Sequence, residues 1–123
     1  MLGDCDIVAF LATSDTTRAR SFFVETLGLS FVSEDPYAIV FDANGVTLRV
    51  QKAKKVEPRP GTVLGWHVPD IEAAVREMGD AGIDFERYEG FGQDDLGIMT
   101  FPGGPRVAWF KDPDGNLLSI DHY

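Results

Sequence analysis

The chain has 123 residues, of which 44% are hydrophobic, enough for one domain (1–123) with a hydrophobic core. A net charge of -9 argues against nucleic acid as a partner, because phosphates are bound by Lys and Arg, and no apolar run approaches the roughly 20 residues of a membrane span. Cys5 is the only cysteine, so no intramolecular disulfide can form, and we expect a protein of the reducing cytoplasm.

The first half of the chain is predicted to fold as β-α-β-β-β. Residues 7–12 form an apolar run typical of a buried strand. A helix should follow, with Ser14 or Asp15 at its N-cap and Gly28 at its end. Three further strands are predicted, at residues 29–33, 37–42 and 46–51.

The second half repeats this pattern after a linker at residues 53–61, which is rich in Lys and Pro. The linker separates unit one, residues 6–52, from unit two, residues 62–121. Asp70 and Gly82 bound a second helix, and their offset from Asp15 and Gly28 is the same to within one residue, which indicates an internal repeat. Strands are predicted before and after this helix, at residues 62–68, 83–88, 107–110 and 117–120.

Between these strands lies a glycine-rich segment, residues 89–105, which has no equal in the first half. Only residues 98–101 within it could pair as a strand. We expect the rest to be a mobile loop that could act as a lid.

The chain ends in a hairpin whose turn is Asp112-Pro113-Asp114-Gly115-Asn116. Proline fixes φ for the turn, the aspartates can bond to their own backbone, and glycine accepts positive φ. On its own, such a turn is an ordinary β-hairpin found in many globular proteins.

Two tandem β-α-β-β-β units that end in this hairpin resemble the vicinal oxygen chelate superfamily, the group of glyoxalase I, bleomycin-resistance proteins and extradiol dioxygenases. The resemblance covers residues 7–121 and includes the segments 12–15, 27–29 and 68–74. It implies an α+β fold in which the curved mixed sheets of two βαβββ units form a ligand cavity. It also implies a homodimer, in which the 53–61 hinge could allow units to exchange between chains.

Metal-dependent members of that family carry four ligands, usually His, Gln or Glu, on four strands. The matching positions here hold residues of other kinds: Val8, Arg49, Leu64 and Ser119. We therefore expect no bound metal and no other cofactor. Strand alternation places Trp66 on the same face as Leu64, toward the cavity, and turns His67 and His122 away from it.

By the same alternation, the cavity should have an apolar, aromatic lining with one cation. The predicted ligand-binding residues are Val8, Phe10, Phe41, Arg49, Gln51, Trp66, Trp109 and Ser119. Such a lining is typical of small-molecule pockets. The Arg49 guanidinium suits an anionic or planar ligand, unless it pairs with a surface acid, and the aromatic side chains could equally be ordinary core.

Three hypotheses follow for function. The preferred one is a metal-independent binding protein, similar to bleomycin-resistance proteins, for a small apolar or aromatic molecule that could also be anionic. The alternative is an enzyme of the same fold, a glyoxalase-like lyase or isomerase or a dioxygenase, whose metal ligands the sequence does not reveal. The third is a protein–protein module whose cavity is filled by its own aromatic side chains.

Overall fold

The computed structural model describes residues 1–123, which divide into two units, Met1–Glu57 and Pro58–Tyr123. The division falls inside the segment 53–61 that the sequence marks as a linker. No helix in either unit combines the length and the apolar character needed to cross a membrane.

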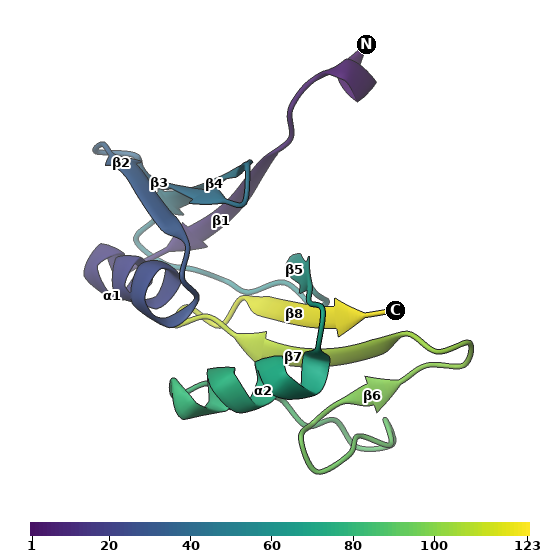
Figure 1. The fold of residues 1–123 in the computed structure, drawn as a ribbon. Helices are drawn as coiled ribbons and strands as arrows, with labels where there is room; N and C mark the ends of the chain where they lie inside the picture. Colours follow the sequence, from purple (N-terminus) through teal and green to yellow (C-terminus); the bar gives the residue numbers. More distant parts are fainter. The chain divides into compact units, whose positions relative to one another are not determined.

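The first unit is a mixed four-stranded sheet with its helical segment against one face (Figure 1). Asp15 caps the helix by accepting a hydrogen bond from the Arg18 N–H at 3.0 Å, and Gly28 follows it with φ +79°. The strand order is β1-β4-β3-β2, with β1 and β4 parallel and the other pairs antiparallel. The elements are β1 (Val8–Thr13), α1 (Thr16–Ser21), a π-helical turn (Phe22–Thr26), β2 (Ser30–Glu34), β3 (Ala38–Ala43) and β4 (Val46–Lys52).

The core of the first unit lies between the helical segment and one face of this sheet. Phe23 of the π-helical turn and Phe41 of β3 are both buried, with ring centroids 5.4 Å apart. Phe41 pairs with Leu48 of β4, so both side chains point to the helix. The opposite face is open, and Val8 and Phe10 of β1 are 45% and 54% exposed on it.

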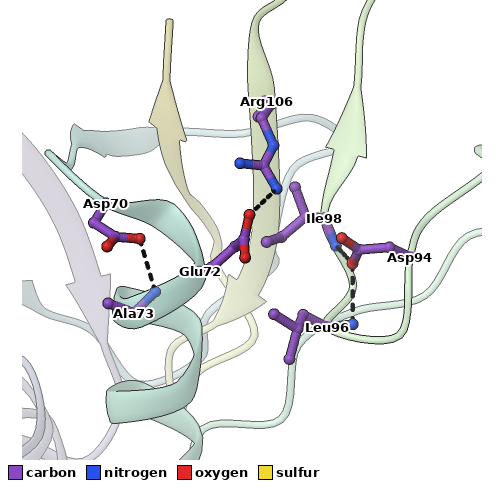
Figure 2. A network of polar contacts seen from close by, with 7 residues as sticks. All are labelled: Asp70, Glu72, Ala73, Asp94, Leu96, Ile98 and Arg106. Atoms are coloured by element: carbon purple, nitrogen blue, oxygen red, sulfur yellow. Dashed lines mark hydrogen bonds and ion pairs between the residues drawn. The ribbon is translucent and has the colours of Figure 1, made fainter.

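The second unit repeats this topology, with strand order β5-β8-β7-β6. Asp70 caps its helix by accepting from the Ala73 N–H at 3.0 Å (Figure 2). The strand predicted at 83–88 is not formed. Glu86 donates one backbone hydrogen bond to Trp109, but the short strand that pairs with β7 is Met99–Thr100. The elements are β5 (Leu64–His67), α2 (Ile71–Asp80), β6 (Met99–Thr100), β7 (Arg106–Lys111) and β8 (Leu117–His122).

One ion pair identifies the helix-covered face of the second sheet. Arg106 of β7 reaches Glu72 of α2 at 2.9 Å (Figure 2). Phe110 lies on the same side of β7, is fully buried, and stacks with Trp66 of β5 at 6.4 Å between ring centroids. Trp66 pairs with Ile120 in β8, which is also buried. The face of this sheet that carries Trp66 is therefore the one packed under α2.

The segment expected to be a mobile lid is held by its own polar groups. The Gln93 amide donates to the carbonyls of Glu86 and Gly97, both at 2.8 Å. The Asp94 carboxylate accepts from the N–H groups of Leu96 and Ile98 (Figure 2). The segment thus has a defined, hydrogen-bonded conformation, which the glycine content alone does not predict.

Candidate functional site

The open face of the second sheet is the face opposite α2. Strand pairing puts His67 beside Asp121, and Ser119 between Gly65 and Trp109. Trp66 lies on the other face, so the facing expected for Trp66 and His67 is reversed. Alternation tells which residues share a face of a strand, but it does not tell which face a helix covers.

A pocket of about 650 Å³ lies on the second unit, where the linker end, the hairpin and the loop after α2 meet. Its wall is aromatic: the ring centroids of Tyr88, Phe91 and Trp109 are 5.3 to 5.7 Å from one another. Trp109 is the one predicted site residue that lines it. The lining residues are Pro58, Arg59, Pro60, Gly61, Thr62, Tyr88, Phe91, Trp109, Lys111, Gly115 and Leu117.

Two cations border this pocket. The Nζ atom of Lys111 lies 3.3 Å from a carboxylate oxygen of Glu86, so that charge is partly balanced. Arg59 makes no ion pair within the unit and its side chain is exposed. The pocket therefore joins an aromatic wall to a guanidinium that has donors left for a ligand.

The first unit carries the predicted cation Arg49 on its open face. Arg49 pairs with Phe10 across β1 and β4, and with Val40 across β3 and β4. Its guanidinium lies 3.6 Å from the Asp35 carboxylate, with side-chain exposures of 34% and 48%. The alternative of a surface ion pair is thus the observed arrangement, and Arg49 is only partly available to a ligand.

Asp35 is held ionised mainly by its own turn. Its carboxylate accepts from the backbone N–H groups of Tyr37 at 2.7 Å and Ala38 at 2.9 Å. These bonds, with smaller contributions from the charges of Arg49 and Lys52, lower the pKa of Asp35 below its ordinary value.

The other predicted residues divide between the two faces. Val8 and Gln51 share the open face of the first sheet with Phe10 and Arg49. Phe41 does not, because it is fully buried against the helical segment. The first sheet therefore presents an exposed, mainly apolar surface with one partly neutralised cation.

The two histidines have different surroundings. His67 Nδ1 bonds to the carboxylate of Asp121 on the open face of the second sheet. His122 pairs with Arg106 on the helix side, and its Nδ1 lies 2.9 Å from the Val68 carbonyl. The two histidines were both expected to point away from the cavity; the strand pairing places them on opposite faces of the second sheet, His122 on the helix side and His67 on the open side.

The four family metal positions do not fit a metal ion. Leu64 has no ligating side chain, and neither has Gly65, the residue of β5 that pairs with Ser119 and shares its face. Val8 has none either, and Arg49 is a cation. In neither unit do three or more His, Cys, Asp or Glu side chains gather as a metal site.

Among the pocket residues that were not predicted from the sequence, four have charged or aromatic side chains: Arg59, Tyr88, Phe91 and Lys111. Three of them lie outside regular strands, where period-two alternation carries no information. Arg59 belongs to the segment expected to be a plain linker. The aromatic pair Tyr88 and Phe91 on either side of a glycine was the available signal, because large aromatic side chains in a loop need a surface to pack on.

Residues 6–120 match the model of the Glyoxalase/Bleomycin resistance protein/Dioxygenase superfamily. Virulence protein STM3117 of Salmonella typhimurium is 29% identical over 126 residues, covering 92% of this chain and 80% of that protein. A superfamily member from Sphaerobacter thermophilus superposes with a TM-score of 0.73 at 22% identity, covering 96% of each chain. A structure titled lactoylglutathione lyase, from Agrobacterium tumefaciens, gives 0.69 at 18% identity, over 97% of this chain and 93% of that one. At these identities the structural likeness concerns the fold.

Proposed function

Because the chain belongs to the Glyoxalase/Bleomycin resistance protein/Dioxygenase superfamily, we propose that it is a metal-independent binding protein for a small, planar, aromatic anion. The observation that carries the proposal is the pocket of the second unit, where Tyr88, Phe91 and Trp109 form a wall beside Arg59 and Lys111. Aromatic rings offer stacking to a planar molecule, and a guanidinium offers paired donors to a carboxylate or sulfonate.

Charge balance supports an anionic ligand at this pocket. The chain as a whole carries a net charge of -9, so a site with two cations and no lining carboxylate stands out from the rest of the surface. Lys111 is partly neutralised by Glu86, whereas Arg59 is not. We assign the main anion contact to Arg59.

We propose the open face of the first sheet as a second ligand-contacting surface, formed by Val8, Phe10, Arg49 and Gln51. Its cation is weaker than that of the pocket, because Asp35 lies 3.6 Å from the guanidinium. Ser119, on the open face of the second sheet, belongs to the proposed site through its pairing with Trp109. The proposed ligand-binding residues do not include Phe41 and Trp66, since both pack under helices.

The proposal also includes a cytoplasmic homodimer. Cys5 is an exposed free thiol, which fits a reducing compartment. Strand β2 is an edge strand, exposed along its whole length, with Val32 57% exposed, and a second copy would cover such an edge. A dimer mass by light scattering at micromolar concentration is the expected result, and a monomer mass contradicts it.

The binding proposal is tested with a matched pair of fluorescent probes. Anilinonaphthalene sulfonate is anionic, and N-phenylnaphthylamine has the same rings without the charge. We expect the anionic probe to bind the native protein more tightly than the uncharged probe. Arg59→Gln should weaken binding of the anionic probe by roughly tenfold, the value of a charge-assisted hydrogen bond, and should leave binding of the uncharged probe unchanged. Arg76→Gln, an exposed arginine of α2, is the control. Equal affinity for both probes in the native protein would overturn the anion assignment.

A further inference from the structure

Strands β5 and β8 bring a histidine and an aspartate together outside the pocket. His67 and Asp121 are in register on the open face of the second sheet, and Nδ1 of His67 bonds to Oδ1 of Asp121. The imidazole is 72% exposed, whereas the carboxylate is 20% exposed. The ring that faces outward is therefore held from behind by a largely covered carboxylate.

This arrangement fixes which nitrogen can accept a proton. A carboxylate only accepts hydrogen bonds, so Nδ1 of His67 is the donor and carries the hydrogen. The other nitrogen, Nε2, then has a free lone pair. Asp121 holds the ring with Nε2 facing outward, as an orienting carboxylate does beside a general base.

Gly65 and Ser119 form the floor of the sheet next to the imidazole. Gly65 pairs with Ser119, and a Cβ atom added to Gly65 would lie 2.6 Å from the Ser119 hydroxyl. The Ser119 hydroxyl therefore fills the space that a side chain at position 65 would take, so Ser119 is itself buried while the Gly65 backbone is exposed two residues before His67. Trp109 borders the floor from β7, where it pairs with Ser119.

Among the groups next to His67, its own Nε2 atom is the one available to accept a proton. The Tyr123 ring meets the imidazole edge to face, at 4.9 Å between centroids. Asp121 is already engaged with Nδ1, and its neighbour on β7 is Val107, which cannot titrate. No cation is paired with His67 or Asp121.

We propose that His67 and Asp121 form a proton-accepting dyad for a planar ligand that lies over the floor of Gly65 and Ser119 and carries a weakly acidic O–H group. In this step the ligand O–H bond breaks, its electron pair stays on the oxygen, and the proton forms an N–H bond at Nε2 of His67. Asp121 acts as a positioning residue. The inference rests on the proposed function, because a planar molecule must first bind to the second unit.

The test uses 4-nitrophenol, whose phenolate absorbs visible light and whose phenol does not, with 4-nitroanisole as the comparator that has no proton to give. In buffer more acidic than the probe's own pKa, the protein-bound probe should hold several-fold more phenolate than the free probe. His67→Gln should return that ratio to the free value, because an amide cannot take up a proton. Asp121→Asn should lower it part of the way toward the free value, through loss of the charge-assisted bond that positions the imidazole. Binding of 4-nitroanisole should not change in either variant.

The control is His122→Gln, which removes the second histidine of the chain from the opposite face and should leave the phenolate ratio unchanged. A phenolate excess that survives in His67→Gln would assign it to the cations of the pocket and overturn the dyad. If both probes bind but the ratio equals that in buffer, this inference fails alone. If neither probe binds, the proposed function fails, and the dyad proposal fails with it.

Discussion

The two open faces of the molecule differ far more than the two helix-covered faces. Under the helices, both units bury apolar side chains on equivalent strands, such as Phe41 and Phe110, and both helices begin at a capping aspartate. On the open faces, the first sheet shows Phe10 and a partly neutralised Arg49, whereas the second shows a histidine–aspartate pair and borders an aromatic pocket. The repeated fold thus depends on apolar residues on the helix-covered face of each sheet, whereas the open faces of the two sheets can carry different functional side chains.

Substitution of phenylalanine on opposite faces gives the largest expected contrast. Phe110→Ala removes a fully buried ring that contacts Trp66 and Phe85, and should lower the free energy of unfolding by about 3–5 kcal/mol. Phe10→Ala acts on a ring that is 54% exposed and should lower it by about 1 kcal/mol or less. Denaturant unfolding measures both values, and equal losses would contradict the division into a core face and an open face.

The two tryptophans test the same contrast by binding. Trp66→Ala should destabilise the protein by roughly 2–3 kcal/mol, because its ring is only partly buried on Phe110, and should leave probe affinity unchanged. Trp109→Ala removes one wall of the pocket and should weaken anilinonaphthalene sulfonate binding about tenfold. Unfolding curves and fluorescence titration separate the effects. Loss of probe binding in Trp66→Ala would return Trp66 to the ligand site.

Two Asp-Pro turns, one in each unit, should respond to pH in opposite directions. Asp35 accepts backbone N–H bonds in an exposed turn and its pKa is lowered. Asp112 accepts the equivalent bonds from Asp114 and Asn116, but it is buried, and this desolvation raises its pKa. The same local hydrogen bonding therefore gives opposite pKa shifts, decided by burial.

The sign of each effect follows from linkage. Asp35 contributes stability that is present above its ordinary value of 3.8 and is lost as the pH falls through its lower folded pKa. Asp112 contributes stability that is present below 3.8 and is lost as the pH rises through its higher folded pKa. Compared with the native protein, Asp35→Asn should become relatively more stable on acidification, and Asp112→Asn relatively less stable. Urea unfolding at a series of pH values measures both trends, and parallel trends would contradict the burial argument.

Much of the fold could be predicted because its signals are local. Asp15 and Asp70 precede apolar helical stripes, and each does cap its helix through an N–H bond. The strand expected at 83–88 failed for a non-local reason. Ile83 and Phe85 alternate with polar residues, as a strand should, but the stretch forms no ladder, and β6 is the strand paired with β7.

The candidate site was harder to predict, since it depends on pairing between distant strands. Leu64 and Ser119 were each assigned to the cavity face from their own strands. The structure pairs Ser119 with Gly65, so the two assignments cannot both hold. The sequence of one strand does not determine its register with a partner strand, and a shift of one residue in that register turns every side chain of the strand to the other face of the sheet. In β5 this one-residue shift places His67, and not Trp66, on the same face as Ser119.

The close approach of Gly65 to Ser119 has a consequence for the evolution of this surface. Any side chain at position 65 places a Cβ atom 2.6 Å from the Ser119 hydroxyl and 3.3 Å from its carbonyl oxygen, so the hydroxyl must rotate away or be lost. The two positions are therefore expected to covary: among homologues, a serine at position 119 should occur together with glycine at position 65. A lineage that gained a larger residue at position 65 would have to turn the Ser119 hydroxyl to another rotamer or replace the serine, so a change at position 65 is expected to alter the chemistry that position 119 offers on this face.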